Sequence, residues 1–288
     1  MKNIREAAVA GIFYPASASR LKSDIQFLLD YNKPEQEFNN IAGIISPHAG
    51  YVYSGNTAAF AYNVVKGKNY STVIIISPSH REYFPGVCIY DGDAYSTPLG
   101  IAQINKEVRN ELTFESSLIF QGVKGHGEEH AVEVQIPFLQ IALADFTIVP
   151  IVIGDQRKEY VYELAKKLSA VMNDQTLIVA SSDLSHFYTK EEANKLDSQI
   201  ERRIENFDYE GLQFDFDNKK CEACGGGGIV ALMKASDLTG KNKAKVLSHT
   251  DSGDITNDNS EVVGYLSAVV YGIGNRDQGL EYLVNSKL

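Results

Sequence analysis

Short runs of apolar, mostly β-branched residues alternate along the chain with longer segments in which apolar residues recur every three or four positions. The short runs are typical of strands buried on both faces, and the longer segments are typical of helices that pack on a sheet. The predicted strands are 8–15, 41–45, 73–76, 86–90, 147–154, 176–186, 245–249 and 262–271. The predicted helices are 17–31, 54–67, 105–113, 128–143, 157–172, 190–206 and 228–236.

This alternation of strands and helices predicts an α/β fold. No linker and no shift of composition divides the chain, so we expect a single domain over residues 1–288. Its sheet should be mixed but mostly parallel and flanked by helices. Two prolines qualify the picture: Pro137 predicts a kink or two abutting helices within 128–143, and Pro150 predicts an edge strand or a bulge.

Two predicted strands end in nearly the same phrase, Ser-Pro-His after 41–45 and Ser-Pro-Ser-His after 73–76. The helix predicted between them makes a βαβ unit, whose strands are parallel and whose hand is right. If the strands are neighbours they lie about 5 Å apart, and His48 and His80 emerge at the same sheet edge. The pair would then be close enough to share a metal ion. The alternative is that each histidine only caps its strand with a hydrogen bond.

A third metal ligand is predicted at Cys224, which directly precedes four glycines and an apparent helix start. A helix N-terminus lowers the pKa of a thiol and favours the thiolate, the form that binds metal. Cys221 and Cys224 also form a C-x-x-C pair, so a redox pair and a structural thiol stay open. The chain has no second C-x-x-C, which excludes a four-cysteine zinc site, and the glycines lack the Lys-Ser/Thr ending of a phosphate-binding loop.

Three further residues are candidates for catalysis. Asp183 and His186 follow the strand 176–186 in the motif SSDLSH, a placement suited to proton transfer or to orienting a ligand. They could equally form a local hydrogen bond that ends the strand. His130 lies beside Glu129 near the start of a predicted helix, on which Glu129 and Glu133 lie one turn apart and share a face. His130 is either a general acid/base or an imidazole bonded to a carboxylate.

The remaining histidines carry weaker signals. His126 lies in a glycine-rich loop and is expected to be solvated, and His249, in or just after a late strand, is expected to be structural. A Ser/His/Asp hydrolase is disfavoured, because the three residue types of SSDLSH are too close in sequence for a triad and no G-x-S-x-G elbow occurs.

Composition narrows the class of protein. The net charge is −10 and no Lys/Arg cluster stands out, so nucleic acid and anionic membranes are unfavourable partners. No apolar segment suits a signal peptide or a bilayer span, which predicts a soluble, cytoplasmic protein. Three cysteines, Cys88, Cys221 and Cys224, do not make a disulfide framework.

Taken together, the segments AGIISPHAGYVYSG, IISPSH, GHGEEHAVEVQIPFLQ, ASSDLSH and CGGGG, in this order, resemble the Memo family, known in bacteria and archaea as AmmeMemoRadiSam system protein B. The resemblance implies a fold similar to class III extradiol dioxygenases, with a cysteine in place of the carboxylate that completes their two-histidine iron site. It implies the metal ligands His48, His80 and Cys224, with Asp183 and His186 lining the same pocket. Family members are described as iron- or copper-binding redox proteins, and the resemblance implies AMMECR-type and radical SAM protein partners.

Three functions are consistent with these residues. The first is a metal-dependent oxidoreductase that holds iron(II) or copper on His48, His80 and Cys224 and acts on an unknown small molecule. In it, His186, Asp183 and His130 would move protons or orient the substrate. The second is a binding module whose pocket accepts a peptide or a protein partner without turnover. The third is zinc-dependent hydrolysis.

Overall fold

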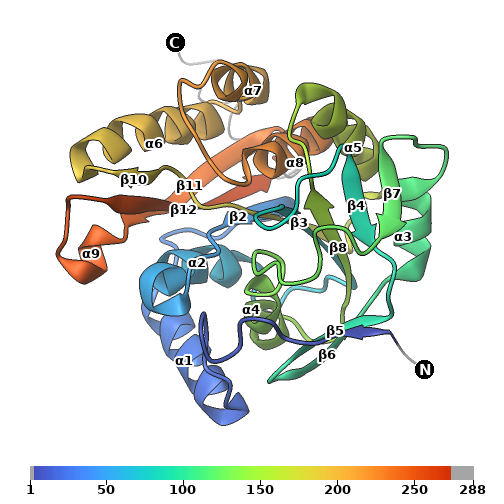
Figure 1. The fold of residues 1–288 in the computed structure, drawn as a ribbon, viewed down its shortest axis with the longest axis horizontal. Coiled ribbons are helices and arrows are strands. Elements are labelled where there is room, and N and C mark those ends of the chain that lie inside the picture. The colour runs from blue at the N-terminus through green and yellow to red at the C-terminus, as the bar shows by residue number, and fades with distance from the viewer. Residues whose placement is uncertain (1–2, 274–288) are drawn as a thin grey trace, which may run out of the picture.

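A mixed sheet of nine strands forms the centre of a single-domain α/β fold in the computed structural model, which describes residues 3–273 (Figure 1). Its order is β10-β12-β2-β9-β3-β8-β4-β7, and β11 pairs with β12. The strands are β2 (Ile41–Ser46), β3 (Thr72–Pro78), β4 (Val87–Tyr90), β7 (Ile119–Gly122), β8 (Thr147–Ile153), β9 (Thr176–Ser181), β10 (His186–Tyr188), β11 (Lys243–Asp251) and β12 (Val262–Tyr271). Only β4, β7 and β12 run against the other six, so the predicted mixed, mostly parallel sheet is confirmed.

Helices cover both faces of this sheet, as Figure 1 shows. One face packs against α1 (Ala18–Tyr31), α2 (Tyr51–Val65) and α4 (Gln135–Ala142). The other face packs against α3 (Lys106–Thr113), α5 (Lys158–Val171), α6 (Lys190–Glu205) and α8 (Gly226–Leu238), with α7 (Tyr209–Asp217) beside α8. The central strands are buried along their whole length because each of their faces contacts one of these apolar layers.

Smaller elements complete the described part of the chain. A three-stranded sheet joins β1 (Ile4–Arg5), β5 (Ala94–Thr97) and β6 (Gly100–Gln103), and a short helix, α9 (Gly253–Thr256), follows β11. The predicted strand over 8–15 is wrong. These residues form bends and turns, and Ala10 and Tyr14 pair with each other in an isolated β-bridge. Within residues 3–273, every helix is too short or too polar to cross a membrane.

The βαβ unit differs from the prediction in one respect that matters for the site. Strands β2 and β3 are not neighbours, because β9 lies between them and pairs in parallel with both. The connecting helix also begins earlier, at Tyr51 with Gly50 as its N-cap, so Ser54 is inside the helix and bonds back to the carbonyl of Ala49 at 3.1 Å. The carboxyl ends of three adjacent parallel strands therefore meet at one sheet edge.

The two prolines have local explanations other than those predicted. Pro137 lies in the first turn of α4, where a missing N–H costs nothing, so the helix is not kinked and simply begins at Gln135. Pro150 lies inside the sheet, opposite Ile75 of β3, and not on an edge strand. On its other side the pairing with β4 reaches only to Ile151, so the proline occupies a position that this ladder leaves unpaired.

Candidate metal centre

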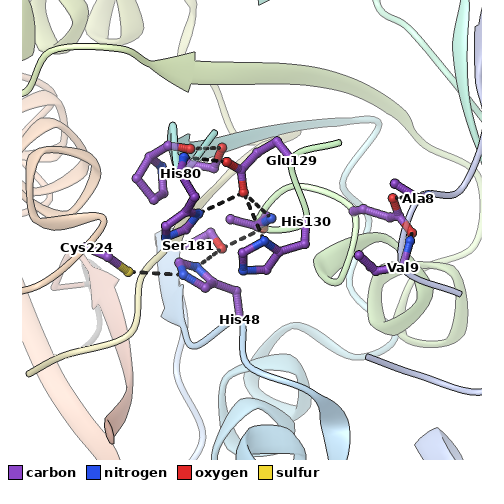
Figure 2. A network of polar contacts seen from close by, with 12 residues as sticks. Ala8, Val9, His48, His80, Glu129, His130, Ser181 and Cys224 are labelled. Atoms are coloured by element: carbon purple, nitrogen blue, oxygen red, sulfur yellow. Dashed lines mark hydrogen bonds and ion pairs between the residues drawn. The ribbon is translucent and has the colours of Figure 1, made fainter. Parts of the chain in front are cut away.

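The carboxyl ends of β2, β9 and β3 carry three of the predicted residues. His48, Asp183 and His80 each lie two positions beyond the last residue of their strand. Helix α8 approaches the same edge and brings Cys224 to it, as Figure 2 shows. One ligand atom from each of His48, His80 and Cys224 lies within 4.8 Å of the other two. The structure thus brings together the predicted trio of metal ligands.

Cys224 is held by the glycine-rich start of α8. A Cβ at Gly225 would lie only 2.2 Å from the carbonyl oxygen of Ser181, so only glycine lets the loop approach the end of β9 this closely. The amide of Gly225 donates to Ser182 Oγ at 2.9 Å. Gln156 Nε2 donates to the carbonyl of Cys224 at 2.6 Å. The thiol is therefore placed by a fixed backbone and does not depend on its own rotamer alone.

His48 is buried, and its hydrogen bonds define which ring nitrogen carries the proton. Its Nδ1 lies 2.9 Å from Ser181 Oγ. Ser181 Oγ donates its single proton to the carbonyl of Ala131 at 2.7 Å. Gln135 Nε2 donates to Ser181 Oγ at 2.8 Å. Ser181 can only accept from His48, so Nδ1 carries the proton and the lone pair of Nε2 faces Cys224 Sγ at 3.1 Å.

His80 is oriented by Glu129, which lies on a loop ahead of α4. Its backbone N–H donates to Glu129 Oε2 at 2.6 Å, and its ring Nδ1 lies 2.9 Å from Oε1. A carboxylate accepts only, so Nδ1 of His80 carries a proton and Nε2 is the ring nitrogen that does not face Glu129. The amide of Ala131 donates to the same carboxylate at 2.9 Å. This carboxylate–histidine arrangement is typical of protein metal sites.

Burial and neighbouring charges set the protonation of this cluster. Burial, together with the nearby His80, lowers the pKa of His48 to about 3, so its imidazole is neutral. Burial would raise the pKa of Glu129, but its hydrogen bonds with His80 bring it down to about 2. Burial raises the pKa of the Cys224 thiol, contrary to the lowering that the helix start predicted. The thiol is therefore a thiolate only when a cation compensates its burial.

The three residues predicted to be catalytic border the same centre. His130 stacks on His80 with ring centroids 4.7 Å apart, and burial lowers its pKa to about 4. Asp183 is buried and accepts the backbone N–H of His48 at 2.7 Å, and burial raises its pKa. His186 is half-buried, and its electrostatic interaction with Asp183 opposes the effect of burial on the pKa of that carboxyl. None of these residues is remote from the trio of ligands.

Other predictions about polar residues are settled by their partners. His126 is not solvated, because it is buried between the hydroxyl of Tyr95, 2.7 Å from Nδ1, and the carbonyl of Cys88, 3.2 Å from Nε2. All three cysteines are free thiols in the structure, and burial raises the pKa of Cys221 to about 11.

His249 lies on β11, away from the trio of ligands. It contacts Glu201 at 3.1 Å through Nδ1 and Asp197 at 3.6 Å through Nε2. Burial would lower its pKa, but these two carboxylates of α6 raise it. Its contacts tie β11 to α6, in line with the expected structural role.

Sequence reasoning missed two residues that orient the ligands. Glu129 was considered only as a partner of His130, whose Nδ1 does lie 3.3 Å from it, but its closer partner is His80. Ser181 carried no signal beyond its place in SSDLSH. Glu133 was expected to share a face with Glu129, yet 131–134 form turns and its buried carboxylate points the other way, toward the N-terminal arm.

A family model and curated relatives identify one family. A family model described as "Memo-like protein" matches residues 5–269. A Thermoplasma volcanium protein named MEMO1 family protein TV1383 is 38% identical over 268 residues, covering 92% of this chain and 98% of that relative. A MEMO1 family protein of Thermotoga neapolitana is 35% identical over 279 residues, covering 93% and 99%. The solved structure of the uncharacterized Escherichia coli protein JW3007 is 14% identical and covers 69% of this chain and 85% of its own, with a TM-score of 0.44.

Proposed function

This chain belongs to the Memo-like family, and from the geometry of its site we propose that it is a metal-dependent redox protein. Its ion, iron(II) or copper, would be held by His48, His80 and Cys224. The observation that carries the proposal is the fixed orientation of both imidazoles. Each has its Nδ1 bonded to a protein partner, and Nε2 of His48 faces the thiol at 3.1 Å.

The chemistry of the donor set favours these metals. Two imidazoles and a thiol suit iron, copper and zinc, whereas magnesium and calcium prefer oxygen ligands. The separation of the ligand atoms, within 4.8 Å of one another, lets one ion bind all three after small movements. When bound, such an ion would supply redox chemistry and a coordination position open to a small molecule.

The surrounding residues would serve this centre as proton carriers and supports. His130 has a pKa lowered to about 4, so it is neutral near pH 7 and can accept a proton from a molecule in the site. Asp183 holds the backbone of His48 by accepting its N–H, and burial raises the pKa of this carboxyl. His186 is the half-buried member of the three, where it would orient a molecule in the site.

Partners and compartment extend the proposal on the strength of the family resemblance. We expect an AMMECR-type protein and a radical SAM protein as partners and the cytoplasm as the compartment. The substrate is a small molecule whose identity the donor set does not specify. Pull-down from a native extract, with the Cys224→Ser variant as the comparison, tests whether these partners recognise the chain and whether recognition needs the metal.

The decisive test is elemental analysis of protein purified without oxygen or chelators. Wild type, His48→Ala and Cys224→Ser are compared, with Cys221→Ser as the matched control because Cys221 is a buried thiol outside the trio. We expect one equivalent of iron or copper in wild type and in the control, and its loss in the other two. Zinc together with oxygen-independent hydrolysis would replace the redox proposal. No metal after reconstitution would leave the pocket as a binding module.

A further inference from the structure

A buried ion pair joins the N-terminal arm to the loop that carries Glu129. Arg5 and Glu133 are 8% and 0% exposed, and Arg5 Nη1 lies 2.6 Å from Glu133 Oε2. The two residues are 128 positions apart in sequence. A buried ion pair is weak evidence for stability, because desolvation offsets much of the attraction. Its other hydrogen bonds therefore indicate what the pair does here.

Two other nitrogens of Arg5 donate to the backbone of the Glu129 loop, and Nη1 also donates to the carbonyl of Glu6 at 3.3 Å. Arg5 Nη2 donates to the carbonyl of Glu129 at 2.5 Å, and Nε donates to the carbonyl of His126 at 2.6 Å. A guanidinium is planar and rigid, so these bonds and the ion pair fix three points of the loop relative to one another. The carboxylate of Glu129, on the other side of that backbone, is the group that orients His80.

Glu133 anchors the arm from the opposite direction. Its carboxylate accepts the backbone N–H groups of Ala8 at 2.8 Å and Val9 at 3.0 Å, and the hydroxyl of Tyr14 at 2.6 Å. Figure 2 shows Ala8 and Val9 beside the histidine and glutamate cluster. The arm turns here because three of its polar groups converge on one buried carboxylate, which removes the unsatisfied donors that a buried turn would otherwise leave.

The arm also contacts the metal centre directly. The ring of Phe13 lies against His130 with centroids 4.6 Å apart. The carbonyl of Phe13 accepts the backbone N–H of Tyr51 at 2.8 Å, and Tyr51 is the first residue of the helix that follows His48. The N-terminal arm therefore contacts both the loop whose Glu129 orients His80 and the helix α2 that follows His48.

We propose that Arg5 is a positioning residue of the metal centre, which acts through the backbone of Glu129 on the orientation of His80. This inference rests on the proposed function, because it concerns how the same centre binds its metal. Residues that orient a metal-binding histidine change metal affinity about 10- to 100-fold when they are removed. The arm thus belongs to the binding site, although it contributes none of the ligands.

A double-mutant cycle separates positioning from a general effect on folding. The full chain is compared as wild type, Arg5→Met, Glu129→Gln and the double variant, and the dissociation constant for cobalt(II) is measured against a competing chelator. Absorption bands of the cobalt–thiolate unit report whether the ligand geometry is retained. We expect Arg5→Met to raise the cobalt dissociation constant about 10- to 100-fold in the wild-type chain. In the Glu129→Gln background, we expect the same substitution to raise it less than about threefold further.

Arg109→Met is the matched control. Arg109 is also 8% exposed and also donates to two carbonyls, those of Tyr90, the last residue of β4, and Gly92. It should lower thermal stability as Arg5→Met does while leaving cobalt affinity within about threefold of wild type. Arg5→Lys keeps the positive charge but loses the planar guanidinium, so its cobalt affinity should lie between those of wild type and Arg5→Met. It replaces Arg5→Met in the comparison if that variant does not fold.

The outcomes are distinguishable. Wild type that binds no metal would overturn the proposed function before any variant is compared. Wild-type affinity in Arg5→Met or Arg5→Lys would overturn the role of Arg5 and leave the metal site intact. Independent, multiplicative losses from Arg5→Met and Glu129→Gln would show that Arg5 does not act through Glu129, and would also overturn the inference.

Discussion

Replacing Glu129 with glutamine tests the orientation of His80 without changing the size of the side chain. The carboxylate accepts three N–H groups, the main chain of His80 at 2.6 Å, its ring Nδ1 at 2.9 Å and the amide of Ala131 at 2.9 Å. Glutamine offers one acceptor oxygen and an NH₂ group in place of the other. Whichever way the amide turns, it faces at least one donor with a donor.

The size of the effect follows from these contacts. Hydrogen bonds to a charged group contribute about 1.5–3 kcal/mol each to stability. Removing the group that orients a metal-binding histidine lowers metal affinity about 10- to 100-fold. The pKa of Glu129 is lowered from 4.5 to about 2, which corresponds to roughly 3 kcal/mol of folding stability. Because the folded pKa is depressed, this stability is present above pH 4.5 and is lost as the pH falls toward 2.

Two assays check the prediction. Competition with a chelator gives the metal dissociation constant, and urea unfolding at a series of pH values gives the free energy of unfolding. Glu222→Gln is the control, since Glu222 also accepts a histidine backbone N–H, that of His186 at 3.1 Å, but contacts none of the ligands. If Glu129→Gln matched wild type in both affinity and acid stability, the orientation of His80 by this carboxylate would be refuted.

Two further predictions concern folding. Gly225→Ala should destabilise the protein by about 1–3 kcal/mol, because the new Cβ would meet the carbonyl of Ser181 at 2.2 Å. Gly127→Ala, where nothing lies within 4 Å, should stay within about 0.5 kcal/mol of wild type in the same urea titration. The raised pKa of His249 means that its contribution to stability is present below its unfolded pKa of 6.5 and is lost as the pH rises through the folded value. The stability difference between wild type and His249→Gln should therefore shrink with rising pH, and a constant difference would contradict the assignment.

The meeting of His48 and His80 was predicted from sequence, but for a reason that is only partly right. The expectation assumed that β2 and β3 are neighbours, whereas β9 separates them and the strand axes are about 10 Å apart. The rings still approach to 5.1 Å between centroids, because both residues lie beyond the strand ends and lean over the end of β9. Strand order depends on contacts between distant segments, so the pattern of one strand does not reveal which strand lies beside it.

The spacing of apolar residues was sufficient to predict strands and helices whose formation depends on that spacing. The segments that became β2, β3, β8 and α5 are recognised by their apolar spacing, because that spacing is what buries them. The pKa of Cys224 and the burial of His126 were both mispredicted, since a helix start and a glycine-rich loop say nothing about what packs over them. Both errors come from treating a segment as if its neighbours in sequence were its neighbours in space.

The groups that orient the ligands are harder to predict than the ligands themselves. A metal restricts its ligands to a few residue types, but a histidine can be oriented by a carboxylate, a hydroxyl, a carbonyl or water, so no residue type marks the partner. Ser181 is 133 positions from His48, and Glu129 is 49 positions from His80.

Yet these partners decide between the two interpretations of the histidines. A histidine that only caps a strand needs no fixed direction for its second nitrogen, whereas here both rings are held through Nδ1 and Nε2 of His48 faces a thiol. The orientation of the rings, more than their proximity, favours a metal centre over a pair of capping residues.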